Sequence, residues 1–369
     1  MNVLVELISS QQILNLVSAV NRKPDRVVFL SAEHPAVLPA EHILKKYLAC
    51  PYETKYYTPE TLEDILSGIQ ADVLEVDVHG GNDLAIAIVS RYAEKTGITV
   101  CYPGFTTKLM YTLQNEELKK TALEIPKFTV REIITLYGGS VRNLPEAVFE
   151  GEDRKAVHAC NRSRQYNSRR WMDFCRTMAN LARKNEGKRV WTAPETVYSE
   201  YRSIFRSVAC VFSRCEVTDG TLKLEFANQE YKVLVTDTGV PFEYETYYQL
   251  EDSGQFDDID IRVNIDWNGG AFNRSDPNSE LDVMASKDGR LISVSCKAGK
   301  YDQQAIYEVK TNAIQFGGEL AVPVLCTDYE RIHNEYAEKA ETLGVLLIQY
   351  DEMREGKAAE RITEWMKTH

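Results

Sequence analysis

The feature that most constrains the fold of this chain is the alternation of short apolar segments with amphipathic ones over its first 140 residues. Strands are expected over residues 3–7, 26–30, 53–57, 72–77 and 99–102. Helical spacing fills residues 11–20, 38–48 and 82–95, and Thr58, Pro59 and Glu60 open a further helix. Strands that alternate with such helices predict a parallel sheet covered on both faces. Residues 1–145 are therefore expected to form a Rossmann-like α/β domain.

Two further regions follow this domain. Residues 146–240 are interpreted as a connecting region, with a basic, aromatic helix over residues 162–182 and strands over residues 205–212, 222–226 and 232–237. Residues 241–369 return to an α/β pattern, with a helix over 241–250, a strand over 259–265 and a hairpin of residues 281–284 and 290–296 around an Asp-Gly turn. Helices over 301–315, 329–343 and 353–366 and strands over 319–325 and 345–350 complete a second predicted α/β domain.

Composition narrows the class of protein without identifying a function. No stretch approaches 18 consecutive apolar residues, and the N-terminus lacks the basic segment of a signal peptide. The eight cysteines form no Cys-x-x-Cys pair, which favours a cytoplasmic chain with free thiols over a zinc site. The net charge of −12 argues against a protein that coats nucleic acid. Residues 152–206, with 13 Lys/Arg against 6 Asp/Glu, are compatible with a nucleic acid substrate or with a solvated helix face.

Two strand-to-helix junctions carry residues suited to an anionic ligand. The first contains Ser9, Ser10, Gln11 and Gln12, and the second contains His79, Gly80, Gly81, Asn82 and Asp83. Ligands of parallel sheets bind beyond the carboxyl ends of the strands, where helix N-termini present N–H groups to phosphate. Neither junction has the Gly-x-Gly-x-x-Gly or Walker pattern, so a dinucleotide or nucleoside triphosphate is disfavoured. The junctions indicate either another nucleotide ligand or two tight turns.

The hairpin of the last region carries the residues most suited to catalysis. Asp282 and Glu280 share one face of its first strand, and Ser295 and Lys297 share one face of its second. A carboxylate beside a lysine can hold a divalent cation, orient water and stabilise negative charge on a phosphate. Oxygen ligands favour Mg²⁺ or Mn²⁺. The alternative is a surface hairpin with solvated charges, but the flanking apolar residues indicate buried strands in which Asp and Lys need partners.

The two strands also resemble a known nuclease core. Ser-Glu-Leu-Asp-Val at 279–283 and Ser-Cys-Lys-Ala-Gly at 295–299 resemble PD-(D/E)XK nucleases, in particular those fused to a CARF domain in CRISPR ancillary nucleases. Pro241-Phe242-Glu243 resembles the helix that opens the nuclease domain of that family with an acidic residue. The resemblance covers nearly the whole chain, is specific at the hairpin and is looser elsewhere. It implies a CARF domain over 1–145 and a nuclease domain over 241–369.

The resemblance also implies an activity, its cofactors and its partners. It implies a metal-dependent endonuclease of type III CRISPR antiviral defence that uses Mn²⁺ or Mg²⁺ and is activated by a cyclic oligoadenylate, with cyclic tetra-adenylate expected. The two junctions named above are where CARF domains bind this ligand. A symmetric cyclic ligand fits a homodimer. The expected substrate is single-stranded DNA, single-stranded RNA or plasmid DNA, and no membrane partner is expected.

One position departs from the family pattern, since Ser295 replaces the glutamate of Glu-x-Lys. Either the site is inactive or another carboxylate substitutes, and the retained hairpin residues favour the second explanation. Glu308, in the helix that follows, is expected to point back at the hairpin. The predicted catalytic residues are therefore Asp282, Lys297, Glu308 and Glu280, with the three carboxylates as metal ligands. The alternatives are a nucleotide-sensing regulatory protein with an inactive nuclease fold and a nucleotide-dependent oxidoreductase, which the missing glycine fingerprint disfavours.

Overall fold

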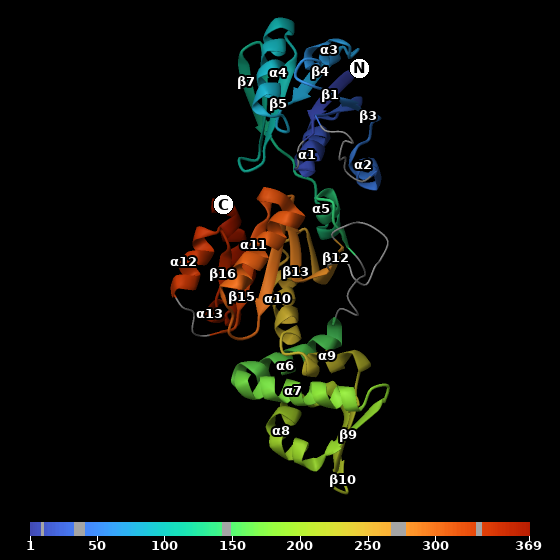
Figure 1. The fold of residues 1–369 in the computed structure, drawn as a ribbon, viewed down its shortest axis with the longest axis vertical. Coiled ribbons are helices and arrows are strands. Elements are labelled where there is room, and N and C mark those ends of the chain that lie inside the picture. Colours follow the sequence, from blue (N-terminus) through green and yellow to red (C-terminus); the bar gives the residue numbers. More distant parts are fainter. Residues whose placement is uncertain (9–10, 33–40, 142–148, 267–277, 330–333) are drawn as a thin grey trace.

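The computed structural model describes residues 1–8, 11–32, 41–141, 149–266, 278–329 and 334–369, which form three parts stacked along one axis (Figure 1). The order in space differs from the order in the sequence. The C-terminal domain lies in the middle, with the N-terminal domain at one end and the helical connecting region at the other. The connecting region is therefore a terminal lobe of the molecule and does not separate the two α/β domains.

The N-terminal domain is built on a seven-stranded sheet of order β3-β2-β1-β4-β5-β6-β7. Its strands are β1 (Asn2–Leu7), β2 (Arg26–Ser31), β3 (Tyr52–Tyr56), β4 (Val73–Asp77), β5 (Thr99–Gly104), β6 (Leu109–Gln114) and β7 (Glu117–Ala122). The first five are parallel, as the sequence predicted, whereas β6 and β7 form an antiparallel hairpin on one edge that was not predicted. Its helices are α1 (Gln12–Arg22), α2 (Glu41–Tyr47), α3 (Leu62–Ser67) and α4 (Asp83–Thr96).

Apolar residues on alternate positions of the strands place these helices on both faces of the sheet. Leu4 packs with α1 and α2, while Val3 and Val5 pack with α3 and α4. The helix predicted to open at Thr58 begins instead at Leu62, because the carbonyl oxygen of Thr58 accepts from two N–H groups in a turn that precedes the helix. The first residues of the helix predicted over 38–48 lie outside the described residues.

A six-stranded sheet of order β16-β15-β14-β13-β12-β8 forms the C-terminal domain. Its strands are β8 (Ser140–Val141), β12 (Asp258–Asp266), β13 (Asn278–Lys287), β14 (Arg290–Lys297), β15 (Val322–Thr327) and β16 (Leu346–Ile348), and its helices are α10 (Val240–Ser253), α11 (Gln303–Gly317), α12 (Asn334–Thr342), α13 (Tyr350–Arg354) and α14 (Ala358–Thr368). The helix predicted over 353–366 is two helices, divided at Gly356 with φ 71°. Part of the helix predicted over 329–343 lies outside the described residues.

The segment between the first two sheets belongs structurally to both domains. Helix α5 (Val130–Leu136) packs Ile133 and Ile134 into a core that also holds Leu16 of α1 and Leu281 of β13. Strand β8 then pairs with β12 in the C-terminal sheet. One continuous apolar core therefore connects the N-terminal sheet to the β13–β14 hairpin through α5.

The connecting lobe combines helices with a three-stranded antiparallel sheet of order β10-β11-β9. Its elements are α6 (Arg154–Tyr166), α7 (Ser168–Lys184), β9 (Val190–Pro194), α8 (Glu195–Ser207), β10 (Phe212–Thr218), β11 (Thr221–Phe226) and α9 (Lys232–Thr236). Short 3-10 turns occupy Gly151–Asp153, Ala209–Val211, Gln229–Tyr231 and Gly318–Leu320.

Three predictions for this lobe were wrong. The single helix over 162–182 is two helices, because Asn167 leaves the helical conformation and caps α7 by accepting from the N–H of Arg170. The segment 205–212 predicted as a strand instead contains the end of α8, a 3-10 turn over Ala209–Val211 and only the first residue of β10. Its residues Phe205, Val208 and Val211 are buried at a spacing of three. The strand over 232–237 is helix α9.

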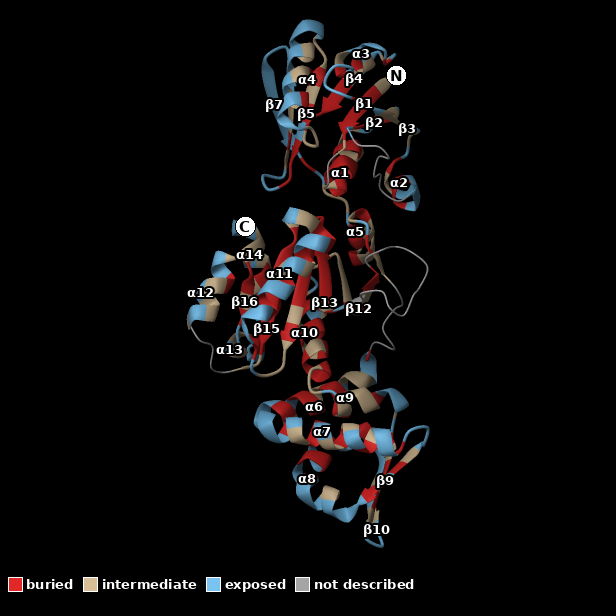
Figure 2. Ribbon diagram, viewed as in Figure 1, coloured by how far each residue is buried: buried red, intermediate tan, exposed pale blue. Residues whose placement is uncertain are grey.

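Burial is concentrated on the sheets and on the inner faces of the helices (Figure 2). Trp171 and Phe174 of α7 share one core with Phe242 of α10 and Val294 of β14, so the lobe is packed directly against the C-terminal domain. None of the helices in the described part of the chain is long and apolar enough to cross a membrane.

Candidate functional site

The first candidate site lies where the β13–β14 hairpin opens. The two strands pair from Lys287↔Arg290 to Val283↔Val294, after which β14 continues beside β15. At this point Asp282 Oδ2 accepts a 2.6 Å hydrogen bond from the Cys296 N–H and a 3.3 Å bond from Ser295 Oγ. The carboxylate of Asp282 is thus held rigidly between the two strands, with Ser295 as its support.

Burial and neighbouring charge act on Asp282 in opposite directions. Burial raises the pKa of the Asp282 carboxyl above its ordinary value, while the Cys296 N–H, the Lys297 ammonium and the Ser295 hydroxyl favour the ionised form. Glu280, two residues earlier on β13, raises the pKa further by like-charge repulsion. The charges of Lys297 and Glu280 thus act on the Asp282 carboxyl, and the association of the three residues in one site stays a prediction.

A third carboxylate, Glu243, enters this site from the first turn of α10. Burial, followed by the charge of Asp282, raises the pKa of Glu243 to about 8, and Arg262 only partly offsets the rise. The side chain of Glu243 is 15% exposed, against 48% for Glu280, so Glu243 is the better shielded neighbour of Asp282. Two carboxylates in such an environment cannot both ionise without a compensating cation.

Arg262 reaches these acids from β12 in a strained conformation. Its φ of 53° is unusual for a residue inside a strand, and its neighbours Ile261 and Val263 pair normally with β13. Nε of Arg262 lies 3.0 Å from a Glu280 carboxylate oxygen and 3.8 Å from one of Glu243. Strain of this kind is characteristic of functional sites, and here it places a cation between two acids.

Glu308, by contrast, lies on the exposed face of α11. Its described side-chain contact is a 2.8 Å hydrogen bond from Gln304 one turn earlier. Within the described residues, neither Glu308 nor Glu243 forms a group with both Asp282 and Glu280 in which all ligand atoms lie within 4.8 Å of one another. The sequence singled out Glu243 only as the acid that opens this domain, because its approach to Asp282 depends on how α10 packs against the sheet.

The chain beyond Lys297 is fixed from the connecting lobe. Asp328, after β15, accepts a 2.6 Å hydrogen bond from the Gly299 N–H and donates its own N–H to the Lys297 carbonyl at 3.4 Å. Arg164 of α6 forms an ion pair with Asp328 and is almost fully buried. Although it belongs to the basic segment noted in the sequence, Arg164 is thus a structural cation and not an exposed one.

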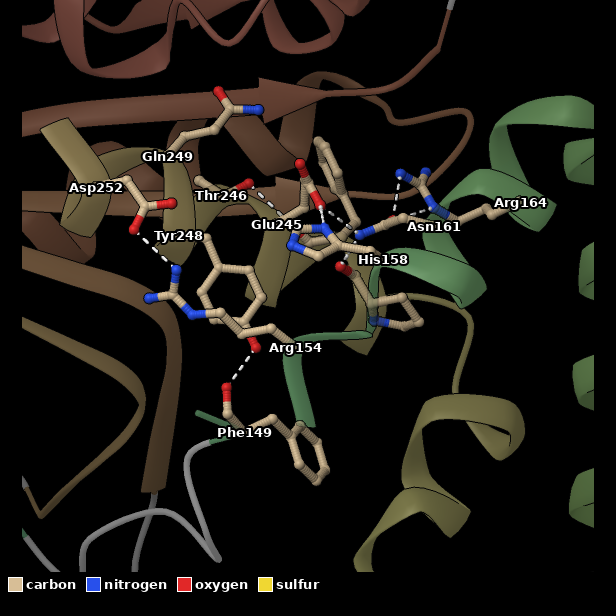
Figure 3. Close-up of polar contacts among 12 residues, drawn as sticks. Phe149, Arg154, His158, Asn161, Arg164, Glu245, Thr246, Tyr248, Gln249 and Asp252 are labelled. Carbon is tan, nitrogen blue, oxygen red and sulfur yellow. Dashed lines mark hydrogen bonds and ion pairs between the residues drawn. The ribbon is translucent and has the colours of Figure 1, made fainter. Parts of the chain in front are cut away.

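Figure 3 shows how α6 is held against α10 around this arginine. Asn161 accepts hydrogen bonds from Arg164 at 3.0 and 3.1 Å, and it donates to Glu245 at 3.2 Å. His158 lies 3.1 Å from the same Glu245 carboxylate oxygen, and Arg154 pairs with Asp252 at 2.8 Å. The contacts join the lobe to the helix that carries Glu243.

The second candidate site is the edge of the N-terminal sheet where β1 and β4 end. These strands are direct neighbours, so the two junctions singled out in the sequence lie at the same edge. Gln11 and Gln12 begin α1 beside it, whereas Ser9 and Ser10 lie outside the described residues. In the other junction, Asn82 Oδ1 caps α4 by accepting from the Ala85 N–H at 2.9 Å.

The turn over 79–82 has little room for larger residues. A Cβ atom at Gly81 would lie 2.6 Å from a Leu7 methyl group, so a larger residue there requires the Leu7 side chain to shift. His79 is anchored through its N–H and its Nδ1, which lie 2.8 and 3.0 Å from Asp77 Oδ1. Gly80 lies in the same turn, and Asp83 is the first residue of α4.

Together these features define a class of architecture. A Rossmann-like domain, with candidate ligand-binding junctions at the carboxyl ends of β1 and β4, is joined through one apolar core to a mixed α/β domain. The hairpin of that second domain carries acidic residues and a lysine. The sequence itself has no significant match to a protein-family model or to a curated protein.

Two solved structures share this architecture over the whole chain. Protein VC1899 from Vibrio cholerae is 14% identical, with a TM-score of 0.74, over 99% of this chain and 98% of that one. Can2 from Sulfobacillus thermosulfidooxidans, solved in complex with cyclic tetra-adenylate, is 14% identical, with a TM-score of 0.69, over 99% of each chain. At this identity the likeness establishes a common fold, and it confirms the predicted mixed α/β architecture with several sheets.

Proposed function

We propose that this chain is a metal-dependent nuclease controlled by a cyclic oligoadenylate, most simply cyclic tetra-adenylate, and that it serves in type III CRISPR antiviral defence. The observation that carries the proposal is the partly buried Asp282 carboxylate, which the Cys296 N–H and Ser295 hold at the opening of the hairpin. The charge of Lys297 favours the ionised form of Asp282, and burial together with the charge of Asp282 raises the pKa of Glu243. The whole-chain fold similarity to Can2, which was solved with cyclic tetra-adenylate, supports the choice of ligand.

The acids of this site fit a divalent cation of the Mn²⁺ or Mg²⁺ type. Asp282 and Glu243 offer carboxylate oxygens, and the raised pKa of Glu243 marks a position where Arg262 only partly offsets a second negative charge. A bound ion there would polarise the scissile phosphodiester and its attacking water. Glu280 is close enough to influence Asp282 and completes the acidic set.

The other residues of the proposed site have separate roles in binding the ion and the phosphate. Asp282 is oriented by the Cys296 N–H and by Ser295, so the serine at the glutamate position of the family pattern supports a carboxylate where it does not supply one. Lys297 places its positive charge beside Asp282, where it would stabilise the charge that accumulates on the phosphate. In this proposal Glu243 has the role that the sequence assigned to Glu308.

We assign the regulatory ligand to the carboxyl ends of β1 and β4. Backbone N–H groups at the start of α4 and the tight turn at Gly81 suit a phosphodiester backbone, and a symmetric ring suits a homodimer in which two such edges meet. Coupling to the nuclease requires that the ligand bind the active arrangement more tightly than the inactive one. The apolar core through α5 offers a direct physical connection between the two sites.

The test is cleavage of plasmid DNA, single-stranded DNA and single-stranded RNA with Mn²⁺, with and without cyclic tetra-adenylate. We expect ligand-dependent cleavage by the wild type and loss in Lys297→Ala and Glu243→Gln. Glu308→Gln is the matched control, because it removes an equivalent charge from an exposed position, and it should retain activity. Loss in Glu308→Gln with retention in Glu243→Gln would restore the original assignment.

A second function, a nucleotide sensor without nuclease activity, is favoured by one observation, the serine at position 295. This function predicts binding of cyclic tetra-adenylate with no cleavage of any of the three substrates by the wild-type protein. Restoring the family residue with Ser295→Glu should then create a nuclease activity that the wild type lacks. Cleavage by the wild type excludes the sensor-only function.

A further inference from the structure

A second group of potential metal ligands lies inside the N-terminal domain, outside the nuclease hairpin. Glu6, Asp77 and His79 each place one ligand atom within 4.8 Å of the others. Glu6 and Asp77 are register partners on the neighbouring parallel strands β1 and β4, so their side chains share one face of the sheet. Both are fully buried, with 0% exposure.

The hydrogen bonds of this group leave one oxygen of each carboxylate without a partner. Asn15 Nδ2 donates to Glu6 Oε2 at 2.9 Å, and His79 uses its N–H and Nδ1 on Asp77 Oδ1. Among the described contacts, Glu6 Oε1 and Asp77 Oδ2 are buried and accept no hydrogen bond. Unpaired buried carboxylate oxygens are costly, and they are uncommon in a well-packed core.

No arginine or lysine in the described part of the chain neutralises this pair. The nearby Arg22 is engaged with Glu75 through two contacts of 2.5 and 2.6 Å. The described ion pair of Asp77 is with His79, and burial and the charge of Asp77 raise the pKa of Glu6 well above its usual range. The site therefore concentrates negative charge in an apolar environment without a matching protein cation.

We propose that Glu6, Asp77 and His79 bind one divalent transition-metal ion, Mn²⁺ or Zn²⁺. Two carboxylates and an imidazole are a ligand set typical of such ions, and they are unlike the all-oxygen sites preferred by Ca²⁺ and Mg²⁺. The ion would join the ends of β1 and β4 directly beneath the turn that contains His79. It would thereby fix the geometry of the proposed ligand-binding edge, although the metal site itself does not depend on that function.

The test uses the full chain with the acids of the hairpin removed, so that bound metal reports on the N-terminal domain. Asp282→Asn/Glu243→Gln protein is stripped with a chelator and titrated with Mn²⁺ or Zn²⁺ alone, with calorimetry and electron paramagnetic resonance as readouts. We expect one site per chain. Adding Glu6→Gln or His79→Gln should weaken binding at least about tenfold, the lower end of what loss of even an outer-sphere partner costs. Asp83→Asn, an exposed acid beside the same turn, is the matched control and should leave the affinity unchanged.

Two results would overturn the proposal. Binding that survives both Glu6→Gln and His79→Gln would place the metal elsewhere. An absence of binding, together with a higher urea midpoint for Glu6→Gln at pH 8, would show that the two carboxylates share a proton instead. Circular dichroism of each variant distinguishes these outcomes from loss of the fold. Because the probe is the metal alone, failure here would leave the proposed nuclease and its nucleotide ligand untouched.

Discussion

Replacement of Glu243 by glutamine should make the protein more stable, and increasingly so as the pH rises. Glu243 has a pKa of about 8 in the folded chain, against an ordinary value of 4.5, because it is buried beside Asp282. The folded state therefore binds the proton more tightly than the unfolded state does between these two values. The contribution of Glu243 to the unfolding free energy is therefore most favourable below pH 4.5. It declines as the pH rises from 4.5 to 8, and above pH 8 it no longer changes.

The size of the effect follows from the same shift. Each tenfold change in proton affinity corresponds to about 1.4 kcal/mol, so complete ionisation of Glu243 costs at most about 5 kcal/mol of unfolding free energy. From pH 5 to pH 8 the difference in unfolding free energy between wild type and Glu243→Gln should therefore grow by about 3 to 4 kcal/mol. Glutamine nearly preserves the shape of the side chain, so little of this difference should come from packing.

Urea unfolding at half-unit steps from pH 5 to pH 8, with a chelator present, measures this difference. Glu308→Gln is the control, and its midpoint should track the wild type, since substitutions at exposed positions rarely change stability by more than about 0.5 kcal/mol. Addition of Mn²⁺ at pH 8 should stabilise the wild type more than Glu243→Gln. A constant separation between wild type and Glu243→Gln at all pH values would refute the reasoning, because it would mean that the carboxyl titrates normally.

Three further predictions concern how the sites are held. Asp328→Asn should lower nuclease activity while cyclic tetra-adenylate binding is unchanged, because it removes the charge that pairs with Arg164 and supports the chain after Lys297; equal loss in both assays would contradict this. Gly81→Ala should weaken cyclic tetra-adenylate binding measured by calorimetry, because its Cβ would lie 2.6 Å from a Leu7 methyl group. Asn82→Ala should cost about 1 kcal/mol in urea unfolding, the usual effect of losing a helix cap, and no change would mean that the cap is dispensable.

The parts of the fold that the sequence predicted well are those where local signals and tertiary packing agree. Asp288 and Gly289 both have positive φ, as in the two-residue hairpin turn that an Asp-Gly pair favours. This turn sets the register of the hairpin, in which Lys287 pairs with Arg290. The apolar strands of the N-terminal sheet are buried on both faces and could be located without knowledge of their partners. The placement of Asp282 and Lys297 on two neighbouring strands was predictable for the same reason, while their catalytic roles stay a prediction.

The predictions that failed, or that were replaced, depend on contacts between distant segments. Phe205 lies in a run of β-formers that is helical because its apolar residues fall on one face against the core of the lobe. Asn167 interrupts a continuous helical pattern through a side-chain cap that no periodicity reveals. Glu243 precedes Asp282 by almost forty residues, and its role depends on the packing of α10, whereas Glu308 is near in sequence but exposed.

Both candidate metal sites contain buried carboxylates whose negative charge is only partly offset by nearby protein cations. At the hairpin, Arg262 and Lys297 offset part of the charge of the buried acids, while Glu6 and Asp77 in the N-terminal sheet have only His79 among their described ion-pairing partners. In each place the fold buries more negative charge than it neutralises, and that cost is recovered only by a proton or by a cation. The two sites lie in different sheets and share no residue. Their contributions to stability should therefore be nearly additive, and a chelator should lower the stability of the metal-loaded wild type by about the sum of its effects on variants that retain one site each.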